Sequence, residues 1–312
     1  MEKKMFAFTT MLAGFFCLVI FSSFSKKDSL EVGPPVPVSP EKETVNSIRR
    51  VNAFDLNKSF SFAGEDIPAD NFDARERLDR ELAVNTYYES ATMLALKTAN
   101  RYFPVIEPIL KKNGIPDDFK YLCVAESNLR MAVSPAGAKG LWQFIESAGK
   151  ENGLEINSEV DERYNVEKST EAACRYLLSL KERFGNWTSA AAAYNTGPSL
   201  LAKRLTEQQV DNYYDLNLNE ETSRYVFRII AIKEIMKDPE RFGFFIDPAQ
   251  LYPEMSNYDA IQFDGPIPSL ATFAKQQGTT YRMLRLYNPW LISGSLTNKY
   301  GKRYEVRVPK KA

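Results

Sequence analysis

The sequence contains no histidine in 312 residues, and this absence limits its chemistry more than any other feature of the composition. A Ser-His-Asp or Cys-His nucleophile system needs an imidazole as its base, so both are excluded. The usual histidine-ligated zinc sites are excluded as well. Any catalysis must therefore rest on carboxyl, hydroxyl, amide or amine groups, and we expect neither a metal nor any other cofactor.

Cysteine and net charge are also scarce. Three cysteines are present, Cys17, Cys123 and Cys174. The last two lie on apolar faces of predicted helices, which favours buried free thiols over a disulfide between them. Forty basic residues balance forty acidic ones. A general nucleic-acid binder would carry a basic excess, so we expect no nucleic-acid partner.

A long apolar run occurs at the N-terminus, where residues 5–21 follow a pair of lysines. This arrangement predicts an export signal in residues 1–25, with cleavage at the small residues that follow the run. Because the run approaches the shorter limit of a membrane span, an uncleaved anchor is the alternative. We therefore expect an exported protein of the periplasm or cell envelope, and the alternative would add membrane association through the N-terminus.

The rest of the chain divides by composition. Residues 26–70 include Gly-Pro-Pro-Val-Pro-Val-Ser-Pro and predict an extended, proline-rich tether. Helical periodicity dominates residues 71–240, and a connector rich in proline and aromatic residues occupies 241–257. Residues 258–312 predict a strand at each end with two short helices between them. The predicted fold is mainly α, with a small α+β domain at the C-terminus.

Local signals predict where helices begin and end in the helical region. Pro104 and Pro108 interrupt a long helical pattern and predict two or more helices there. Ser169 is a suitable N-cap for a helix that ends at Phe184. Two further helices are predicted at about 187–194 and 222–236.

Glu126 is the candidate catalytic residue. Phe119, Leu122, Cys123 and Glu126 recur at spacings of three and four, so they share a helix face that is apolar until the carboxylate ends it. Burial against apolar groups favours the neutral form of a carboxyl group. A glutamic acid that stays protonated near neutral pH can act as a general acid. An exposed glutamate at a helix end is the alternative.

Four motifs follow one another in the helical region. They are Glu-Ser-Asn (126–128), Val-Ser-Pro-Ala-Gly-Ala-Lys-Gly-Leu-Trp-Gln-Phe (133–144), Ala-Ala-Ala-Tyr-Asn-Thr-Gly (191–197) and Glu-Thr-Ser-Arg-Tyr-Val (221–226). In this order and spacing they resemble the family 1 lytic transglycosylases of bacterial cell walls, and within that family the membrane-bound D type. The resemblance covers roughly residues 101–237 and implies a goose-type-lysozyme-like helical catalytic domain.

The C-terminal segment, residues 258–312, resembles a LysM peptidoglycan-binding module in its strand–helix–helix–strand order. It departs from that pattern because its opening strand lacks the usual Gly-Asp-Thr and because residues 293–302 form a long loop. A structural role against the catalytic domain is therefore the alternative to glycan binding.

The family resemblance implies a reaction on peptidoglycan glycan strands, which are the expected partner. Glu126 would protonate the glycosidic oxygen between N-acetylmuramic acid and N-acetylglucosamine. The same carboxylate would then take a proton from the muramoyl primary hydroxyl, which closes on the anomeric carbon and gives a 1,6-anhydro end without water. The substrate's acetamido group assists in the family, so a second enzyme carboxylate is unnecessary.

Three other acids lie near the motifs and have simpler interpretations. Glu146 is the nearest alternative to Glu126, and we interpret it as a first-turn helix acid. Asp161 is expected to cap the following turn or to pair with Arg163. Glu221 is expected to open the last helix of the domain.

The resemblance also assigns the residues that meet substrate: Ser127, Ser134, Gln143, Tyr194, Asn195 and Tyr225. Gln143 is expected to hydrogen-bond the sugar, and Tyr225 to donate its hydroxyl to the catalytic carboxyl. Core packing is the alternative for Tyr194 and Tyr225, and a local backbone hydrogen bond is the alternative for Ser127. Two other functions stay open, a muramidase that hydrolyses the same bond and a wall-binding scaffold without activity.

Overall fold

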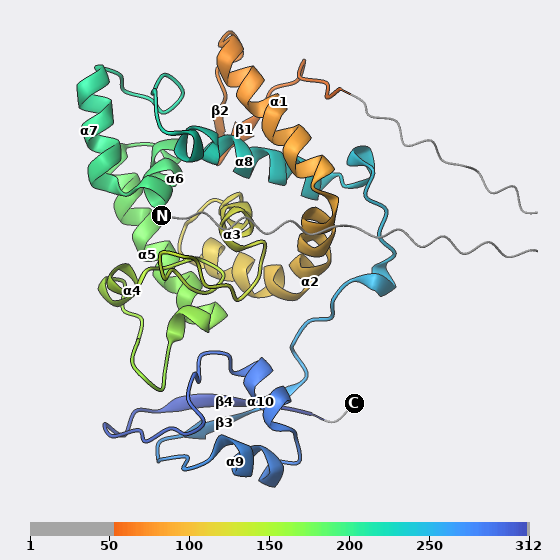
Figure 1. The fold of residues 1–312 in the computed structure, drawn as a ribbon, viewed down its shortest axis with the longest axis vertical. Coiled ribbons are helices and arrows are strands. Elements are labelled where there is room, and N and C mark those ends of the chain that lie inside the picture. The colour runs from red at the N-terminus through yellow and green to blue at the C-terminus, as the bar shows by residue number, and fades with distance from the viewer. Residues whose placement is uncertain (1–52, 311–312) are drawn as a thin grey trace, which may run out of the picture. The chain divides into compact units, whose positions relative to one another are not determined.

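The computed structural model describes residues 53–310 (Figure 1). The predicted export segment, Cys17 and most of the predicted tether lie outside this range. The larger part contains α1 (Phe72–Tyr87), α2 (Glu89–Lys112), α3 (Phe119–Ser127), α4 (Glu146–Glu151), α5 (Val166–Phe184), α6 (Trp187–Thr196), α7 (Pro198–Gln208) and α8 (Glu220–Lys237). Short 3-10 turns are η1 (Glu162–Tyr164), η2 (Glu240–Phe242) and η3 (Pro248–Gln250). No helix within residues 53–310 is long and apolar enough to cross a membrane.

Helix α8 lies at the centre of the helical part. It packs against α1, α3 and α6, and Figure 1 shows α1 running alongside it. Asn219 caps its first turn by accepting a hydrogen bond from the Thr222 amide. In α6 the run Ala190–Ala193 is fully buried, and such short side chains allow the α5 and α8 backbones to approach closely. The mainly α prediction is confirmed.

The position of α3 along α8 is fixed by a buried ion pair. Asp118, just before α3, receives a hydrogen bond from Lys233 of α8 at 2.6 Å, and both side chains are nearly inaccessible to solvent. Asp118 also accepts the Ala63 amide at 2.8 Å, while Lys233 donates to the Ser61 carbonyl at 2.8 Å. These bonds satisfy charges that would otherwise be costly to bury, so α3 has one favourable position on α8.

The segment before α1 is part of the core, which corrects the predicted tether boundary at residue 70. Residues 61–66 form an antiparallel hairpin, β1 (Ser61–Phe62) and β2 (Glu65–Asp66). Phe60, Phe62 and Ile67 are buried in the main hydrophobic core. The tether predicted for residues 26–70 therefore ends before Phe60, because these apolar side chains need cover.

The two or more helices predicted between residues 73 and 110 are present as α1 and α2, but the break lies at Tyr88 rather than at the prolines, and the start predicted for α5 is also wrong. Helix α2 continues through Pro104 and Pro108, since both prolines lie on its exposed face, where the carbonyl groups they leave unpaired can bind water. Helix α5 begins three residues earlier than predicted. Asn165, rather than Ser169, caps it by accepting the Lys168 amide, and the Ser169 hydroxyl donates to the Val166 carbonyl inside the helix.

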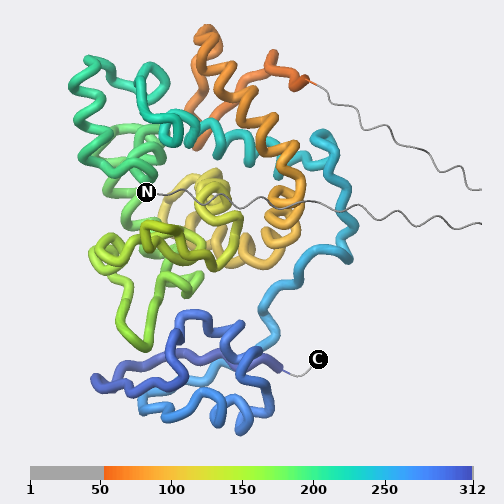
Figure 2. Tube along the Cα trace, in the orientation of Figure 1, coloured from red at the N-terminus to blue at the C-terminus, as the bar shows by residue number. Residues whose placement is uncertain are grey.

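The C-terminal module has the predicted order of elements. It contains β3 (Tyr258–Phe263), α9 (Leu270–Gln276), α10 (Tyr281–Tyr287) and β4 (Tyr304–Pro309). The two strands are antiparallel, with Tyr258 opposite Pro309 and Phe263 opposite Tyr304. The connector appears in Figure 2 as the light-blue tube between α8 and this module. It is tied to α2, because the Tyr252 amide donates to the Lys97 carbonyl and Asn100 donates to the Tyr252 carbonyl.

A hairpin of the helical part completes the module's core. Val160 is 1% exposed and packs within the module's own hydrophobic cluster. It pairs with Leu291 in an antiparallel bridge, where the Asp161 amide donates to the Trp290 carbonyl at 2.8 Å and the Ile292 amide donates to the Glu159 carbonyl at 2.9 Å. The module and the helical part thus share apolar and backbone contacts at this point.

This shared contact predicts that the module stabilises the helical part. In the full chain, Val160→Ala should lower the free energy of unfolding by about 1.5 kcal/mol, at ~0.8 kcal/mol per buried methylene. In a chain that lacks residues 258–312, Val160 loses its cover and the same substitution should have almost no effect. Urea unfolding followed by circular dichroism measures all four proteins. An equal cost in both backgrounds would mean that Val160 is buried by the helical part itself.

Candidate active site

The carboxyl group of Glu126 meets the hydroxyl of Tyr225 where α3 crosses α8. Tyr225 donates a hydrogen bond to Glu126 Oε1, and its side chain is 1% exposed. Glu126 is partly exposed and lies one residue before the end of α3. The other members of its helix face, Phe119, Leu122 and Cys123, are fully buried, as predicted. The predicted hydrogen bond between Tyr225 and Glu126 is therefore present.

The surroundings of Glu126 raise the pKa of its carboxyl group into the neutral range, so that protonated and ionised forms are both populated near pH 7. Burial raises its pKa from 4.5 to about 7. The hydrogen bond from Tyr225 and the positive charge of Arg228 act in the opposite direction, and Glu221 adds a smaller upward effect. Burial and the charge of Glu126 also raise the pKa of Tyr225 well above 10, so the phenol keeps its proton and remains a donor. This combination gives one acid that can both release and recover a proton at neutral pH.

The loop after α3, residues 132–144, folds back on itself. The Ser134 amide donates to the Ala138 carbonyl and the Ser134 hydroxyl accepts the Ala138 amide at 3.0 Å. Gln143 has a positive φ of 50°, and its side-chain amide donates to the Gly140 carbonyl at 2.7 Å and to the Ala132 carbonyl at 3.3 Å. The Gln143 nitrogen is thus occupied by the loop, which leaves its carbonyl oxygen as the group free to contact a ligand.

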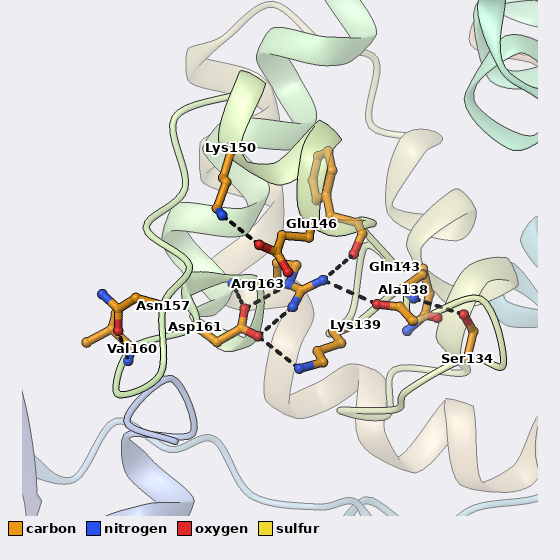
Figure 3. A network of polar contacts seen from close by, with 12 residues as sticks. Ser134, Ala138, Lys139, Gln143, Glu146, Lys150, Asn157, Val160, Asp161 and Arg163 are labelled. Atoms are coloured by element: carbon orange, nitrogen blue, oxygen red, sulfur yellow. Dashed lines mark hydrogen bonds and ion pairs between the residues drawn. The ribbon is translucent and has the colours of Figure 1, made fainter. Parts of the chain in front are cut away.

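A buried ion pair supports this loop from outside, as Figure 3 shows. Arg163 binds both carboxylate oxygens of Asp161, at 2.8 and 2.7 Å, and donates to the loop carbonyls of Gly137 and Phe144. Lys139 of the loop also reaches Asp161 at 3.3 Å. Burial opposes ionisation of Asp161, but the Arg163 and Lys139 bonds and charges outweigh it and hold its pKa below 3.8. Asp161 both caps η1 and pairs with Arg163, as expected from the sequence.

Three more predicted site residues occupy α3 and α6. The Tyr194 hydroxyl donates to the Trp142 carbonyl at 2.7 Å and so links α6 to the loop. Burial raises the pKa of Tyr194 well above 10, and the charge of Glu126 adds to this rise. Asn195 is partly exposed. Ser127 is buried and its hydroxyl donates to the Cys123 carbonyl at 3.1 Å, which is the local hydrogen bond that was the alternative to substrate contact.

The remaining expectations from the sequence also have structural outcomes. Glu146 is exposed in the first turn of α4 and pairs with Lys150, while Glu221 is exposed in the first turn of α8. Cys123 and Cys174 are buried free thiols, as predicted. Glu146 and Glu221 are thus exposed and Asp161 is bound by Arg163, whereas Glu126 is mostly buried and forms no ion pair within residues 53–310.

Sequence reasoning missed a group of charges behind Tyr225. Glu81 of α1 is fully buried, accepts a hydrogen bond from Arg224 and lies 3.6 Å from Arg228 Nε. These contacts hold α1 against α8 and place the charge of Arg228 near Glu126. The signal available was helical spacing, because Arg228 follows Tyr225 by three residues and shares its side of α8.

Comparison with known proteins identifies two domains. Residues 103–217 match the transglycosylase SLT domain, and residues 259–312 match the soluble lytic transglycosylase C-terminal LysM-like domain. The chain is 28% identical over 261 residues to the membrane-bound lytic murein transglycosylase D of Escherichia coli (strain K12), covering 81% of this chain and 56% of that protein. The protein of the same name from Escherichia coli O6:H1 (strain CFT073) gives the same figures. The chain spans about half the length of the curated relatives it matches.

The loop support predicts a specific effect of Gly140→Ala. A Cβ at this position would lie 1.9 Å from the Arg163 carbonyl oxygen, so either the loop or η1 must move. Gly137→Ala is a matched control, since Gly137 has a similar φ (77° against 79°) but no atom within 4 Å of an added Cβ. Backbone strain, about 1 kcal/mol, is common to both variants. Thermal melts should show a clearly larger decrease in melting temperature for Gly140→Ala than for Gly137→Ala. Equal decreases would contradict the close contact between position 140 and the Arg163 carbonyl oxygen.

The raised pKa of Glu126 predicts a pH dependence of stability. Between pH 4.5 and about 7 the folded protein holds a proton that the unfolded chain has released. This stabilising contribution is complete below about pH 4.5 and is lost as the pH rises through 7, by up to about 3 kcal/mol. Glu126→Gln removes it, so the stability difference between this variant and the wild type should change across that window. In the wild type the hydrogen bond from Tyr225 lowers the pKa of Glu126. Tyr225→Phe removes this bond, so the pKa should rise and the pH window should extend upward.

Urea unfolding of the three proteins from about pH 4 to about pH 8 measures these differences. Parallel profiles for the wild type and Glu126→Gln would show that Glu126 titrates normally. A Tyr225→Phe profile identical to the wild type would show that the phenol does not affect the carboxyl group.

Proposed function

We propose that this chain, which carries an SLT domain and a LysM-like C-terminal domain, is a peptidoglycan lytic transglycosylase. It cleaves the β-1,4 bond between N-acetylmuramic acid and N-acetylglucosamine and leaves 1,6-anhydromuramoyl ends. The observation that carries the proposal is the Glu126 carboxyl group, whose pKa of about 7 combines with a single neutral donor, Tyr225. That pair suits a group that must act first as an acid and then as a base.

In the first step the protonated Glu126 carboxyl gives its proton to the glycosidic oxygen. The bond from that oxygen to the anomeric carbon breaks, and N-acetylglucosamine leaves with the proton on its new hydroxyl. The acetamido group of the muramic sugar assists at the anomeric carbon. Tyr225 supports the carboxylate that forms, since a hydrogen bond to a charged acceptor is worth about 1.5–3 kcal/mol.

In the second step the Glu126 carboxylate takes the proton of the muramoyl primary hydroxyl. The oxygen of that hydroxyl bonds to the anomeric carbon and closes the 1,6-anhydro ring. Glu126 ends protonated, so the cycle needs no water and no second enzyme carboxylate. The exposed, paired state of Glu146 and the Arg163-bound state of Asp161 support a mechanism with one acid.

The loop and α6 supply the groups proposed to hold the sugar. Gln143 would accept a hydrogen bond through its carbonyl oxygen, because its nitrogen is engaged with Gly140. Ser134 and Asn195 are partly exposed and would contact hydroxyl or acetamido groups. Tyr194 would act through its hold on the Trp142 carbonyl. A substrate role for Ser127 stays a prediction beside its observed bond to Cys123.

We also propose that the protein is exported, because its substrate lies outside the cytoplasmic membrane. The lysine pair and apolar run in residues 1–25 support export, with an uncleaved anchor as the form that would attach the enzyme to the membrane. The LysM-like domain supports contact with glycan strands.

Digestion of purified peptidoglycan, followed by mass analysis of the products, tests the proposed reaction. The wild type should release fragments with anhydromuramoyl ends. Glu126→Gln should fold and lose activity, because the amide cannot donate and recover a proton, and acid–base assistance is worth roughly 10²–10⁴-fold. Glu146→Gln, a matched loss of a nearby exposed acid, should keep wild-type activity.

Two results would contradict this assignment. Fragments with reducing muramic ends would identify a muramidase that hydrolyses the same bond. If the wild type released no products at all, the protein would instead be a wall-binding scaffold without activity.

A further inference from the structure

A pocket separate from the candidate active site lies between the helical part and the C-terminal module. Its volume is about 330 Å³, within the range of ligand sites, and it is lined by parts of α2, α10, the connector and the segment after η1. None of the proposed catalytic or sugar-binding residues lines it. It adjoins the active-site loop, because Met131 in its wall precedes Ala132, whose carbonyl group accepts the Gln143 hydrogen bond.

The walls of this pocket are mainly aromatic and aliphatic. Its rings are contributed by Tyr102, Tyr164, Tyr258, Tyr287 and Trp290. Burial raises the pKa of Tyr102 and of Tyr164, so both phenols remain neutral near pH 7 and can donate hydrogen bonds. Such walls suit a ligand with short aliphatic side chains and amide groups.

Three arginines and two glutamates, Glu167 and Glu254, line the pocket, so its lining has a net positive charge. Among residues 53–310, no carboxylate oxygen lies within 4.0 Å of Arg101 or Arg285, whereas Arg307 in the same wall is paired with Glu167 and Glu305. Arg101 Nε donates to the Pro253 carbonyl at 3.1 Å, and Arg285 Nη1 donates to the Ser293 carbonyl at 2.6 Å.

These backbone bonds orient both guanidinium groups while leaving several N–H donors unused. A planar guanidinium held in place is well suited to bind a carboxylate through two parallel hydrogen bonds. The pocket therefore combines apolar walls with two oriented sites for negative charge.

We propose that this pocket binds the acidic peptide stem of peptidoglycan, with stem carboxylates on Arg101 and Arg285. The inference rests on the proposed function, because a stem is attached to the muramic sugar of the strand that the active site would hold. A glycan strand without stems carries one lactyl carboxylate on each muramic sugar, held next to the sugar ring, whereas a stem carries several carboxylates along its length and can reach both guanidinium groups. The position of Met131, between the pocket and the loop, is consistent with a stem that leaves the sugar and enters the pocket.

The test uses the full chain carrying Glu126→Gln, which holds substrate without cleaving it. Calorimetry compares a disaccharide–tetrapeptide muropeptide with the same disaccharide freed of its peptide. The muropeptide should bind at least tenfold more tightly. Arg101→Gln and Arg285→Gln should each weaken muropeptide binding about tenfold, because each removes charged hydrogen bonds. Neither should alter binding of the peptide-free disaccharide.

Arg282→Gln is the matched control, since Arg282 lies exposed on the same helix α10 but does not line the pocket. It should leave both affinities unchanged. Equal affinity for the two ligands would overturn the proposal, as would an equal loss in Arg282→Gln and Arg285→Gln. Arg285 also donates to the Ser293 carbonyl, so the melting temperature of Arg285→Gln is compared with that of the wild type to detect a loss of folding. Arg101→Gln tests the same pocket from a different element, α2.

These outcomes are distinct from failure of the proposed reaction. If wild-type digests contain no anhydro ends but Arg101→Gln and Arg285→Gln lose muropeptide binding, the reaction is wrong and the peptide site stands. If anhydro ends form and the two variants bind the muropeptide normally, the reaction stands and the peptide site is wrong.

Discussion

The structure depends on the way α3 and α8 are held against each other. Asp118 and Lys233 pair at one end of the contact, and Glu126 and Tyr225 pair at the other. Asp118 and Glu126 are eight residues apart, and so are Tyr225 and Lys233, which corresponds to about 12 Å along a helix axis. Both pairs can therefore form together when the two helices run antiparallel in one register. A shift by one turn would leave an unpaired buried charge at one end and an unsupported carboxyl group at the other.

That register explains how a fold that favours apolar burial can hold a useful acid. The apolar face of α3 packs into the core, which brings Glu126 to the edge of the buried region. Burial then raises its pKa, while Tyr225 and Arg228 prevent the rise from making the carboxyl group permanently neutral. Arg228 is held in turn by Glu81 of α1. The same packing that stabilises the helices therefore sets the proton affinity of the acid.

The motifs led to a correct prediction of the hydrogen bond between Tyr225 and Glu126, whereas several element boundaries were predicted wrongly. Glu126, Tyr225 and the loop were found from motifs, because a reaction restricts residue identity at fixed spacing. The hairpin at residues 61–66 was missed because a strand pair of two residues each shows too little alternation to detect. Pro104 and Pro108 misled because their effect depends on which face they occupy, and periodicity alone does not show that both are exposed. Contacts such as Glu81 with Arg224 join residues 143 positions apart and have no local signal.

Asp161 connects the C-terminal module to the loop at residues 132–144. Its amide donates to the Trp290 carbonyl of the module, and its carboxylate binds Arg163, which in turn holds the loop carbonyls of Gly137 and Phe144. A displacement of the module would therefore act on a residue that is 1% exposed and has little room to relax. This geometry favours a structural role for the module in addition to any affinity for glycan.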